Sequence, residues 1–204
     1  SKLVRKMSPS GLTYLADMNP SGGLYHKMDH LACFAGAMFA LGAAARNSSS
    51  EGGPNHNSGE HFRVGAEITK TCHEMYAQMP SKVAPEFISI GQNDFVSGAA
   101  HNLLRPEAVE SFFVLWRLTH DNVYREYGWN VFQAFERHCK SAHGYSGLRD
   151  VRTSIDPQKD NSQPSYFLAE TLKYLYLLFS SDDVIPLDQY VFNTEAHPLK
   201  IQQK

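Results

Sequence analysis

Near the C-terminus, the segment Phe192-Asn193-Thr194-Glu195-Ala196-His197-Pro198 sets a threonine beside a glutamate, between an aromatic residue and a proline. A threonine offers two neutral oxygens, its hydroxyl and its carbonyl. A hard cation such as calcium accepts such oxygens and takes about 6–8 of them. By itself the segment is more typical of an ordinary strand end. A metal site would need further oxygen-bearing side chains from elsewhere in the chain.

Two carboxylates stand close together in Arg105-Pro106-Glu107-Ala108-Val109-Glu110-Ser111. Pro106 suits the first position of a helix, where its missing N–H costs nothing, so Glu107 becomes the second helical residue. There it could simply offset the helix dipole, which is worth about 0.3–1 kcal/mol. Glu110, three residues on, shares the same face. Two carboxylates so close repel each other unless a cation or ordered water separates them, so the spacing fits either a capped helix or a site.

A further carboxylate, Glu170, lies inside the apolar run Phe167-Leu168-Ala169-Glu170-Thr171-Leu172-Lys173-Tyr174. Burying a charged carboxylate without a partner costs on the order of several kcal/mol of folding free energy. Its partner could be Lys173 or an arginine, in which case Glu170 is structural. It could equally be buried for a functional reason.

The histidines give no clear metal motif. His26 and His30 are four residues apart, so one helix could present both, but no third ligand is evident and no HExxH occurs. The residues alone favour a surface or capping role for this pair.

The composition is that of an ordinary globular protein. In 204 residues, 42% are hydrophobic and the net charge is −2, so no basic field indicates a nucleic-acid partner. No run of 18 apolar residues predicts a membrane span. The start has neither a methionine nor a signal peptide, and we expect the chain to be part of a longer one.

Three cysteines, Cys33, Cys72 and Cys139, form no CxxC pair, and their odd number leaves the compartment open. Three buried thiols are one reading. Asn47-Ser48-Ser49 fits the N-glycosylation pattern, which has meaning only in a secreted chain.

The elements that must position these side chains are nearly all helical by their period. The three-and-four spacing of one apolar set predicts a first helix with a buried stripe of Met28, Leu31, Ala32, Ala35, Met38 and Phe39. A polar loop follows over 46–60. A second helix is expected over about 62–79, and its buried stripe comprises Val64, Ile68, Cys72, Met75, Tyr76 and Met79. A third begins at Pro106, and its buried stripe comprises Val109, Phe112, Phe113 and Trp116. Further helices are expected from Asp121 or Asn122 to about 140 and over about 165–179, with a short strand around 87–90, a loop over 141–164 and a terminal hairpin. Such helical hairpins suit an (α/α) toroid or an irregular bundle.

These strings together resemble the class I α-1,2-mannosidases, glycoside hydrolase family 47, over nearly the whole chain. Further strings that carry the resemblance are Met28-Asp29-His30-Leu31-Ala32-Cys33-Phe34, Thr71-Cys72-His73-Glu74-Met75-Tyr76, Tyr145-Ser146-Gly147-Leu148-Arg149-Asp150 and Tyr174-Leu175-Tyr176-Leu177-Leu178-Phe179. The resemblance implies an all-α fold, an incomplete (α/α)7 barrel with a short C-terminal β-hairpin. It makes residues 1–204 the C-terminal part of one catalytic domain, without its N-terminal half.

The resemblance also implies roles. Thr194 would be the sole direct protein ligand of Ca²⁺, and Glu107 the general base of an inverting hydrolysis of terminal α-1,2-linked mannose from high-mannose N-glycans. Further sugar-pocket or water-holding positions would be His30, Glu86, Arg105, Glu110, Tyr166, Glu170 and Glu195. Cys33 and Cys72 would form the family disulfide, with Cys139 free, in the lumen of the Golgi or endoplasmic reticulum. Any membrane attachment would come from an upstream anchor.

Two departures matter. The family's general acid and another catalytic aspartate would lie in the missing N-terminal half, so this chain alone could be inactive. Tyr166 stands where the family usually carries phenylalanine, which could shift the stack on a sugar ring. The alternative function is a mannosidase-like glycan-binding protein of quality control with little or no catalysis.

Overall fold

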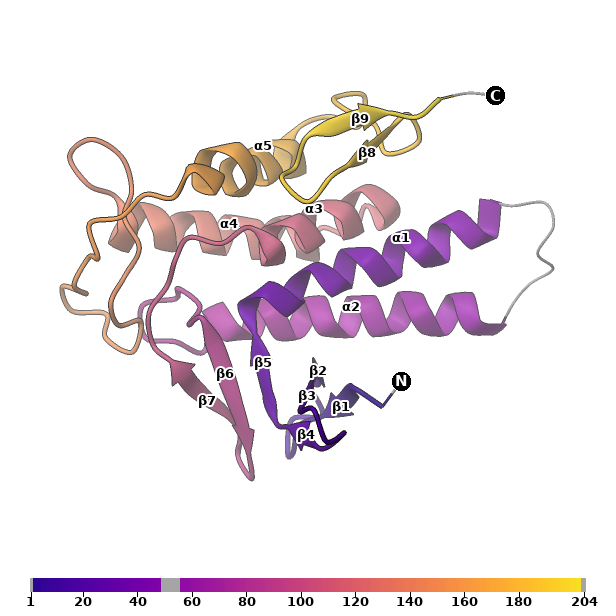
Figure 1. Cartoon of the computed structure of the whole chain (residues 1–204). Coiled ribbons are helices and arrows are strands. Elements are labelled where there is room, and N and C mark those ends of the chain that lie inside the picture. Colours follow the sequence, from indigo (N-terminus) through magenta and orange to yellow (C-terminus); the bar gives the residue numbers. More distant parts are fainter. Residues whose placement is uncertain (1, 49–55, 203–204) are drawn as a thin grey trace.

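The computed structural model describes residues 2–48 and 56–202. Its main elements are five helices, α1 (Phe34–Ser48), α2 (His56–Ala77), α3 (Glu107–Thr119), α4 (Val123–Ala134) and α5 (Lys173–Phe179). Three short helical segments adjoin them: the 3₁₀ helix η1 (His30–Cys33) and the π-helices η2 (Phe135–Cys139) and η3 (Phe167–Leu172). Figure 1 shows α1 and α2 as an antiparallel pair, with α3, α4 and α5 stacked above them.

Helix α3 is the centre of the molecule, because it contacts α1, α2, α4 and α5. Its residues are buried on nearly every side, including Phe112, Phe113 and Leu115 at 0% exposure. Pro106 precedes it with φ −88°, and His120 ends it in the left-handed region at φ 56°. The predicted stripe of Val109, Phe112, Phe113 and Trp116 is confirmed, and the helix begins at Glu107, one residue after the expected start.

Helices α1 and α2 approach unusually closely. A Cβ at Gly65 of α2 would lie 2.7 Å from the carbonyl oxygen of Gly36 in α1, so only a glycine fits there. The expected disulfide joins Cys33, next to α1, to Cys72 in α2 across 39 residues of sequence. By the chain-entropy account, closing a loop of this length stabilises the fold by about 4 kcal/mol. Cys139 is free and buried, as expected.

Small antiparallel sheets accompany the helices. The strands β5 (Lys27–Asp29), β6 (Phe87–Gly91) and β7 (Asp94–Ala99) form one sheet below α1 and α2 (Figure 1). Before them, β1 (Val4–Lys6) pairs with β2 (Thr13–Leu15), and β3 (Asp17–Met18) pairs with β4 (Leu24–Tyr25). The C-terminal hairpin of β8 (Tyr190–Phe192) and β9 (Pro198–Lys200) was expected; the N-terminal strands and β7 were not.

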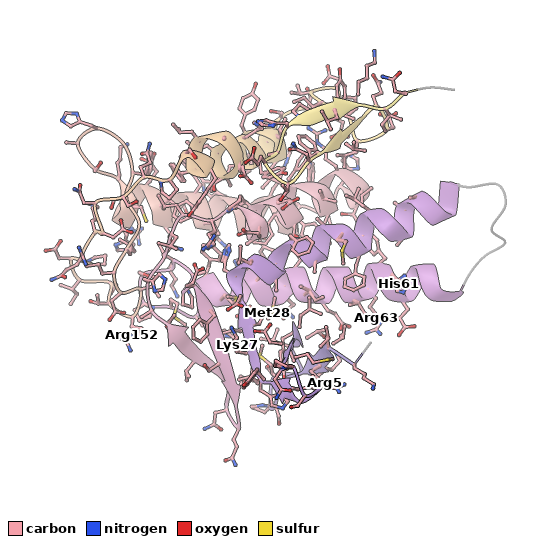
Figure 2. All side chains as sticks on the ribbon, in the orientation of Figure 1. Arg5, Lys27, Met28, His61, Arg63 and Arg152 are labelled. Atoms are coloured by element: carbon pink, nitrogen blue, oxygen red, sulfur yellow. A yellow bond between two sulfur atoms is a disulfide. The ribbon has the colours of Figure 1, made fainter. Side chains whose placement is uncertain are left out.

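The first expected helix is partly wrong. Met28 lies in strand β5, where it is fully buried, and Figure 2 shows it beside Lys27 beneath the helices. Leu31 and Met38, assigned to the buried stripe, are 45% and 49% exposed. The three-and-four spacing occurs here across a strand, a turn and a helix, so it does not mark one face.

The other helices match their expected ranges within a few residues, with one clear difference. Helix α2 begins at His56 rather than near residue 62, although its stripe of Ile68, Cys72, Met75 and Tyr76 is buried as expected. The glycosylation pattern at Asn47–Ser49 and most of the loop expected over 46–60 lie outside the residues whose side chains are described. Within the described ranges, no helix combines the length and apolar character needed to cross a membrane.

Candidate functional site

The N-terminal turn of α3 carries the first two carboxylates of the site. Glu107 accepts a hydrogen bond from the ring of His30, with 3.0 Å between Nδ1 and Oε2. His30 comes directly after β5, and its backbone N–H donates to the Glu86 carbonyl at 2.8 Å. The sheet therefore fixes where the imidazole meets α3.

His30 is 1% exposed, so the surface role favoured by the sequence is wrong for it. Its second ring nitrogen, Nε2, lies 2.8 Å from the hydroxyl of Tyr76 in α2. Both nitrogens are thus occupied by protein groups. His26 is exposed, outside any helix, and its Nδ1 lies 2.6 Å from the Tyr14 hydroxyl, so one helix does not carry both histidines.

Glu107 stays ionised at neutral pH. Burial by itself raises its pKa, but the hydrogen bond and electrostatic attraction of the His30 N–H, a backbone hydrogen bond in the helix N-terminus and the charge of Arg105 outweigh it. The pKa of Glu107 is therefore below the ordinary value. A buried but ionised carboxylate is a competent proton acceptor.

Glu110, one helical turn further along, has the opposite electrostatic state. Burial, followed by repulsion from Glu107 and Glu170, raises its pKa to about 7. A hydrogen bond with Tyr174 of α5 opposes the rise but does not cancel it. Close carboxylates cannot all stay ionised without a cation, so Glu110 holds a proton for much of the time near neutral pH.

Glu170 lies in η3 and is only half-buried, less than its apolar neighbours suggested. Burial and the charges of Glu107 and Glu195 raise its pKa, while Lys173 and His197 lower it. Of the two partners considered for Glu170, Lys173 forms no ion pair with it among the described residues; its Nζ donates instead to the Ala196 carbonyl at 2.8 Å. That bond ties α5 to the turn between β8 and β9, which carries Thr194 and Glu195.

These elements meet around one pocket of about 380 Å³. Carboxylates from α3 and η3 and one threonine from the C-terminal hairpin line it, together with apolar and amide side chains. The full lining is Leu31, Phe34, Pro106, Glu107, Glu110, Glu170, Phe192, Asn193 and Thr194. The convergence expected from the sequence is therefore present for Glu107, Glu110, Glu170 and Thr194. Glu195 is exposed and outside the lining, although its charge is felt by Glu170.

The donor set around Thr194 fits a hard cation. Thr194 is exposed and lines the pocket, and no hydrogen bond involves its hydroxyl or carbonyl oxygen within the described part of the chain. In the same residues, no three His, Cys, Asp or Glu side chains are grouped closely enough to hold a metal directly. A cation here would use neutral threonine oxygens and water, with the carboxylates holding the water.

A second cluster lies beside the pocket. The guanidinium of Arg105 forms an ion pair with Glu86 through two of its nitrogens. Nε and Nη2 of Arg105 each lie 2.8 Å from Oε1 of Glu86. The guanidinium also lies 6.0 Å from the ring centre of Tyr166, whose hydroxyl donates to the Leu103 carbonyl at 2.8 Å. None of these three residues lines the carboxylate pocket, so their sugar contacts stay predictions.

Three contributors to the site were not assigned a role from the sequence. Tyr76 was read as core, and Tyr174 as part of an apolar helix, although their hydroxyls bond to His30 and Glu110. Phe34 adds an exposed aromatic edge to the pocket. A tyrosine at a core position, where phenylalanine would pack as well, is the one signal that could have indicated the first two.

Comparisons with known proteins agree on one family. The sequence model described as glycosyl hydrolase family 47 matches residues 1–201. Mannosyl-oligosaccharide α-1,2-mannosidase IA of Drosophila melanogaster is 53% identical over 98% of this chain and 29% of its own length. Mannosyl-oligosaccharide 1,2-α-mannosidase MNS1 of Arabidopsis thaliana is 50% identical over 98% of this chain and 34% of its own length.

Among solved structures, an α-1,2-mannosidase from Trichoderma reesei superposes with a TM-score of 0.86 at 27% identity. The match covers 98% of this chain and 44% of the other. The chain thus spans about a third of the curated relatives and less than half of this structural neighbour.

Proposed function

Because the chain belongs to glycosyl hydrolase family 47, we propose that it is the C-terminal part of one catalytic domain that hydrolyses terminal α-1,2-linked mannose from high-mannose N-glycans. The relatives are named mannosyl-oligosaccharide α-1,2-mannosidases, and the solved neighbour is named an α-1,2-mannosidase. In the complete protein, these helices would form one side of an (α/α)7 barrel. The chain would supply the base and the calcium side of the site.

The pocket that Glu107, Glu110, Glu170 and Thr194 share is the observation that carries this proposal. The four residues come from α3, η3 and the C-terminal hairpin, yet they face one cavity. A pocket of about 380 Å³ is ample for a single sugar ring, since ligand pockets start at roughly 300 Å³. Phe34 and Leu31 give it an apolar wall, against which the carbon face of a sugar can pack.

Glu107 is the proposed general base. Its lowered pKa keeps it ionised, His30 holds the carboxylate through Oε2, and the residue lines the pocket, where it would accept a proton from water. In an inverting glycosidase the base activates a water on the face of the ring opposite the leaving oxygen, and the two carboxyl groups stand about 6.5–9.5 Å apart. The acid would come from the part of the family domain that this chain does not span.

Thr194 would hold calcium through its hydroxyl and carbonyl oxygens, with Glu110, Glu170 and Glu195 holding the surrounding water or the sugar hydroxyls. The bound ion would bind sugar hydroxyls and favour the distorted ring of the oxocarbenium-like state. Arg105, Glu86 and Tyr166 would contact the glycan beyond the reacting sugar. The Cys33–Cys72 disulfide supports an oxidising compartment, the lumen of the Golgi or endoplasmic reticulum.

The proposal is tested with the complete protein and a high-mannose glycan that ends in α-1,2-linked mannose. We expect release of mannose that is first seen as the β-anomer by proton NMR, and no release after calcium is removed by a chelator. A glycan trimmed to α-1,3 and α-1,6 ends is the control and should remain intact. Tight glycan binding without any release would instead support the glycan-binding alternative, and early α-anomer would contradict inversion.

A further inference from the structure

The hydroxyl of Tyr76 is placed in the protein core. The residue lies on the buried stripe of α2 and is 2% exposed. Its ring packs edge-on against Phe135, with 6.3 Å between the ring centres. Phenylalanine would fill this space equally well, yet the position carries an O–H that needs a partner inside the protein.

That partner is Nε2 of His30, at 2.8 Å, and His30 has a second partner in Glu107, with 3.0 Å from Nδ1 to Oε2. The three groups therefore form one chain of hydrogen bonds from the core to the pocket. The rings of Tyr76 and His30 meet edge to face, with 5.7 Å between their centres. The exposure of the Glu107 side chain is 14% and that of His30 is 2%, so water reaches only the carboxylate end.

The protons along this chain can be assigned from what each group can donate. An ionised carboxylate only accepts, so Nδ1 of His30 must carry a proton. Burial, together with the nearby charge of Glu107, raises the pKa of Tyr76 well above its ordinary value, so the phenol keeps its proton. Within the described residues the Tyr76 hydroxyl has no other hydrogen-bond acceptor, so it donates to Nε2.

We infer that Tyr76 is a positioning residue for Glu107, because its hydroxyl holds His30 as the neutral Nδ1–H tautomer whose N–H orients the carboxylate. The inference rests on the proposed role of Glu107 as base. Without the Tyr76 hydroxyl, Nε2 would be a buried acceptor with no partner. The ring could then tip or take up a second proton, and either change would move Glu107. Removing the hydrogen-bond partner behind a metal-bound histidine typically costs about 10–100-fold in activity, and we expect a loss of the same order here.

Tyr14 provides a matched control elsewhere in the molecule. It is also 2% exposed, and its hydroxyl also meets a histidine, with 2.6 Å to Nδ1 of His26. That pair joins β2 to the segment after β4, and within the described residues neither member bonds to Glu107. Tyr14→Phe therefore removes the same atoms from the same kind of pair, away from the site.

The first measurement is NMR of the complete protein labelled with ¹⁵N-histidine. In the wild type, we expect His30 to show a proton on Nδ1 and a hydrogen-bonded, unprotonated Nε2. In Tyr76→Phe, the Nε2 resonance should shift and the Nδ1 proton should exchange faster with water. Tyr14→Phe should leave the His30 signals unchanged. A wild-type His30 protonated on Nε2 alone would overturn the inference, whether or not the variant folds.

The second measurement is the kinetics of α-1,2-mannose release. We expect Tyr76→Phe to lower kcat by about 10–100-fold with KM changed less than about threefold, whereas Tyr14→Phe stays at the wild-type rate. In a Glu107→Gln background, Tyr76→Phe should add little further loss, because the group it positions is already gone.

The two proposals fail in different ways. If Glu107→Gln loses turnover but Tyr76→Phe keeps the wild-type kcat, Tyr76 is only a packing residue and the proposed function stands. If Glu107→Gln keeps full turnover, the base is elsewhere and the proposed function fails at that residue. Loss of kcat in Tyr76→Phe with unchanged His30 signals would also contradict the positioning role.

Discussion

Two regions of this molecule that carry carboxylates differ in how much positive charge surrounds them. On the side of the N-terminal strands, Glu67 of α2 accepts from Arg63 at 2.6 Å, from Thr13 at 2.5 Å and from Lys6 at 3.2 Å. Figure 2 shows Arg63 on α2 above the strands that carry Arg5. Burial works against ionisation, but the bonds from Thr13, Lys6 and Arg63 outweigh it and lower the pKa of Glu67.

At the start of α3 the carboxylates outnumber their cationic partners. Glu110 has Tyr174 as its hydrogen-bond partner, and its pKa rises to about 7 under burial and the charges of Glu107 and Glu170. Glu67, whose oxygens are bonded by lysine and arginine, serves the fold. Carboxylates that crowd a pocket, and remain short of positive charge, are arranged for a ligand that brings it.

The comparison is tested most strongly by removing one charge from each region. We expect Glu107→Gln to lower kcat for mannose release by about 1,000-fold, within the range that a general base contributes. Binding of a ground-state inhibitor should change far less. The matched variant Glu67→Gln should keep the wild-type kcat. Equal losses in both variants would show that fold damage, rather than chemistry, explains the effect.

Calcium affinity should also distinguish the two regions. We expect Thr194→Ala to weaken calcium binding by about 100-fold in calorimetry of the complete protein, because it removes one of two direct protein oxygens. Thr194→Ser keeps the hydroxyl and should bind nearly as well as the wild type. Thr13→Ala, which removes the hydroxyl bonded to Glu67, should leave the calcium affinity unchanged. Unchanged affinity in Thr194→Ala would remove this residue from the metal site.

The pH dependence of stability that comes from Glu110 should have the opposite sign to the one that comes from Glu67. The pKa of Glu110 is about 7 when folded and 4.5 in the ordinary state, so between these values the folded protein holds a proton that the unfolded chain has lost. Stability therefore falls as pH rises from about 4.5 to 7, by about 3 kcal/mol. Glu170, whose pKa is also raised, acts in the same direction. The lowered pKa of Glu67 contributes stability above 4.5 that is lost as pH falls below it.

Denaturant titrations at several pH values, with a chelator present, measure this slope. Glu110→Gln should remove most of the fall in stability between pH 4.5 and 7. Glu67→Gln should leave that fall in place and instead weaken the loss of stability in more acidic solution. A Glu110→Gln variant whose stability changes between these two pH values as the wild type's does would contradict the raised pKa of Glu110.

The sequence predicted the carboxylate pocket better than the elements behind it. The three-residue spacing of Glu107 and Glu110 depends only on helix geometry, and both do line one pocket. The place of Thr194 came from resemblance, and the hairpin that carries it is present. By contrast, the partnership of His30 with Tyr76 depends on where β5 ends and α2 passes, which no local pattern near residue 30 encodes.

The N-terminal strands show the same limit. β1 to β4 are only two or three residues long, too short for a period-2 pattern to stand out. They are held by contacts far away in sequence, such as the Thr71 hydroxyl donating to the Thr13 carbonyl at 2.6 Å. Local propensity could not predict an element whose stability comes from such a tertiary contact.

The smallest expected effect is the stability of Glu67→Gln at neutral pH. Lys6 and Arg63 are 59% and 56% exposed, so their attraction to Glu67 is screened by water and each pair contributes at most about 1 kcal/mol. The neutral amide of glutamine can still accept from Thr13. We therefore expect a loss of about 1 kcal/mol in the free energy of unfolding, reduced further in high salt. A loss above about 3 kcal/mol would mean that Glu67 behaves as a buried ion pair, and the contrast between the two regions would then be one of burial rather than of missing positive charge.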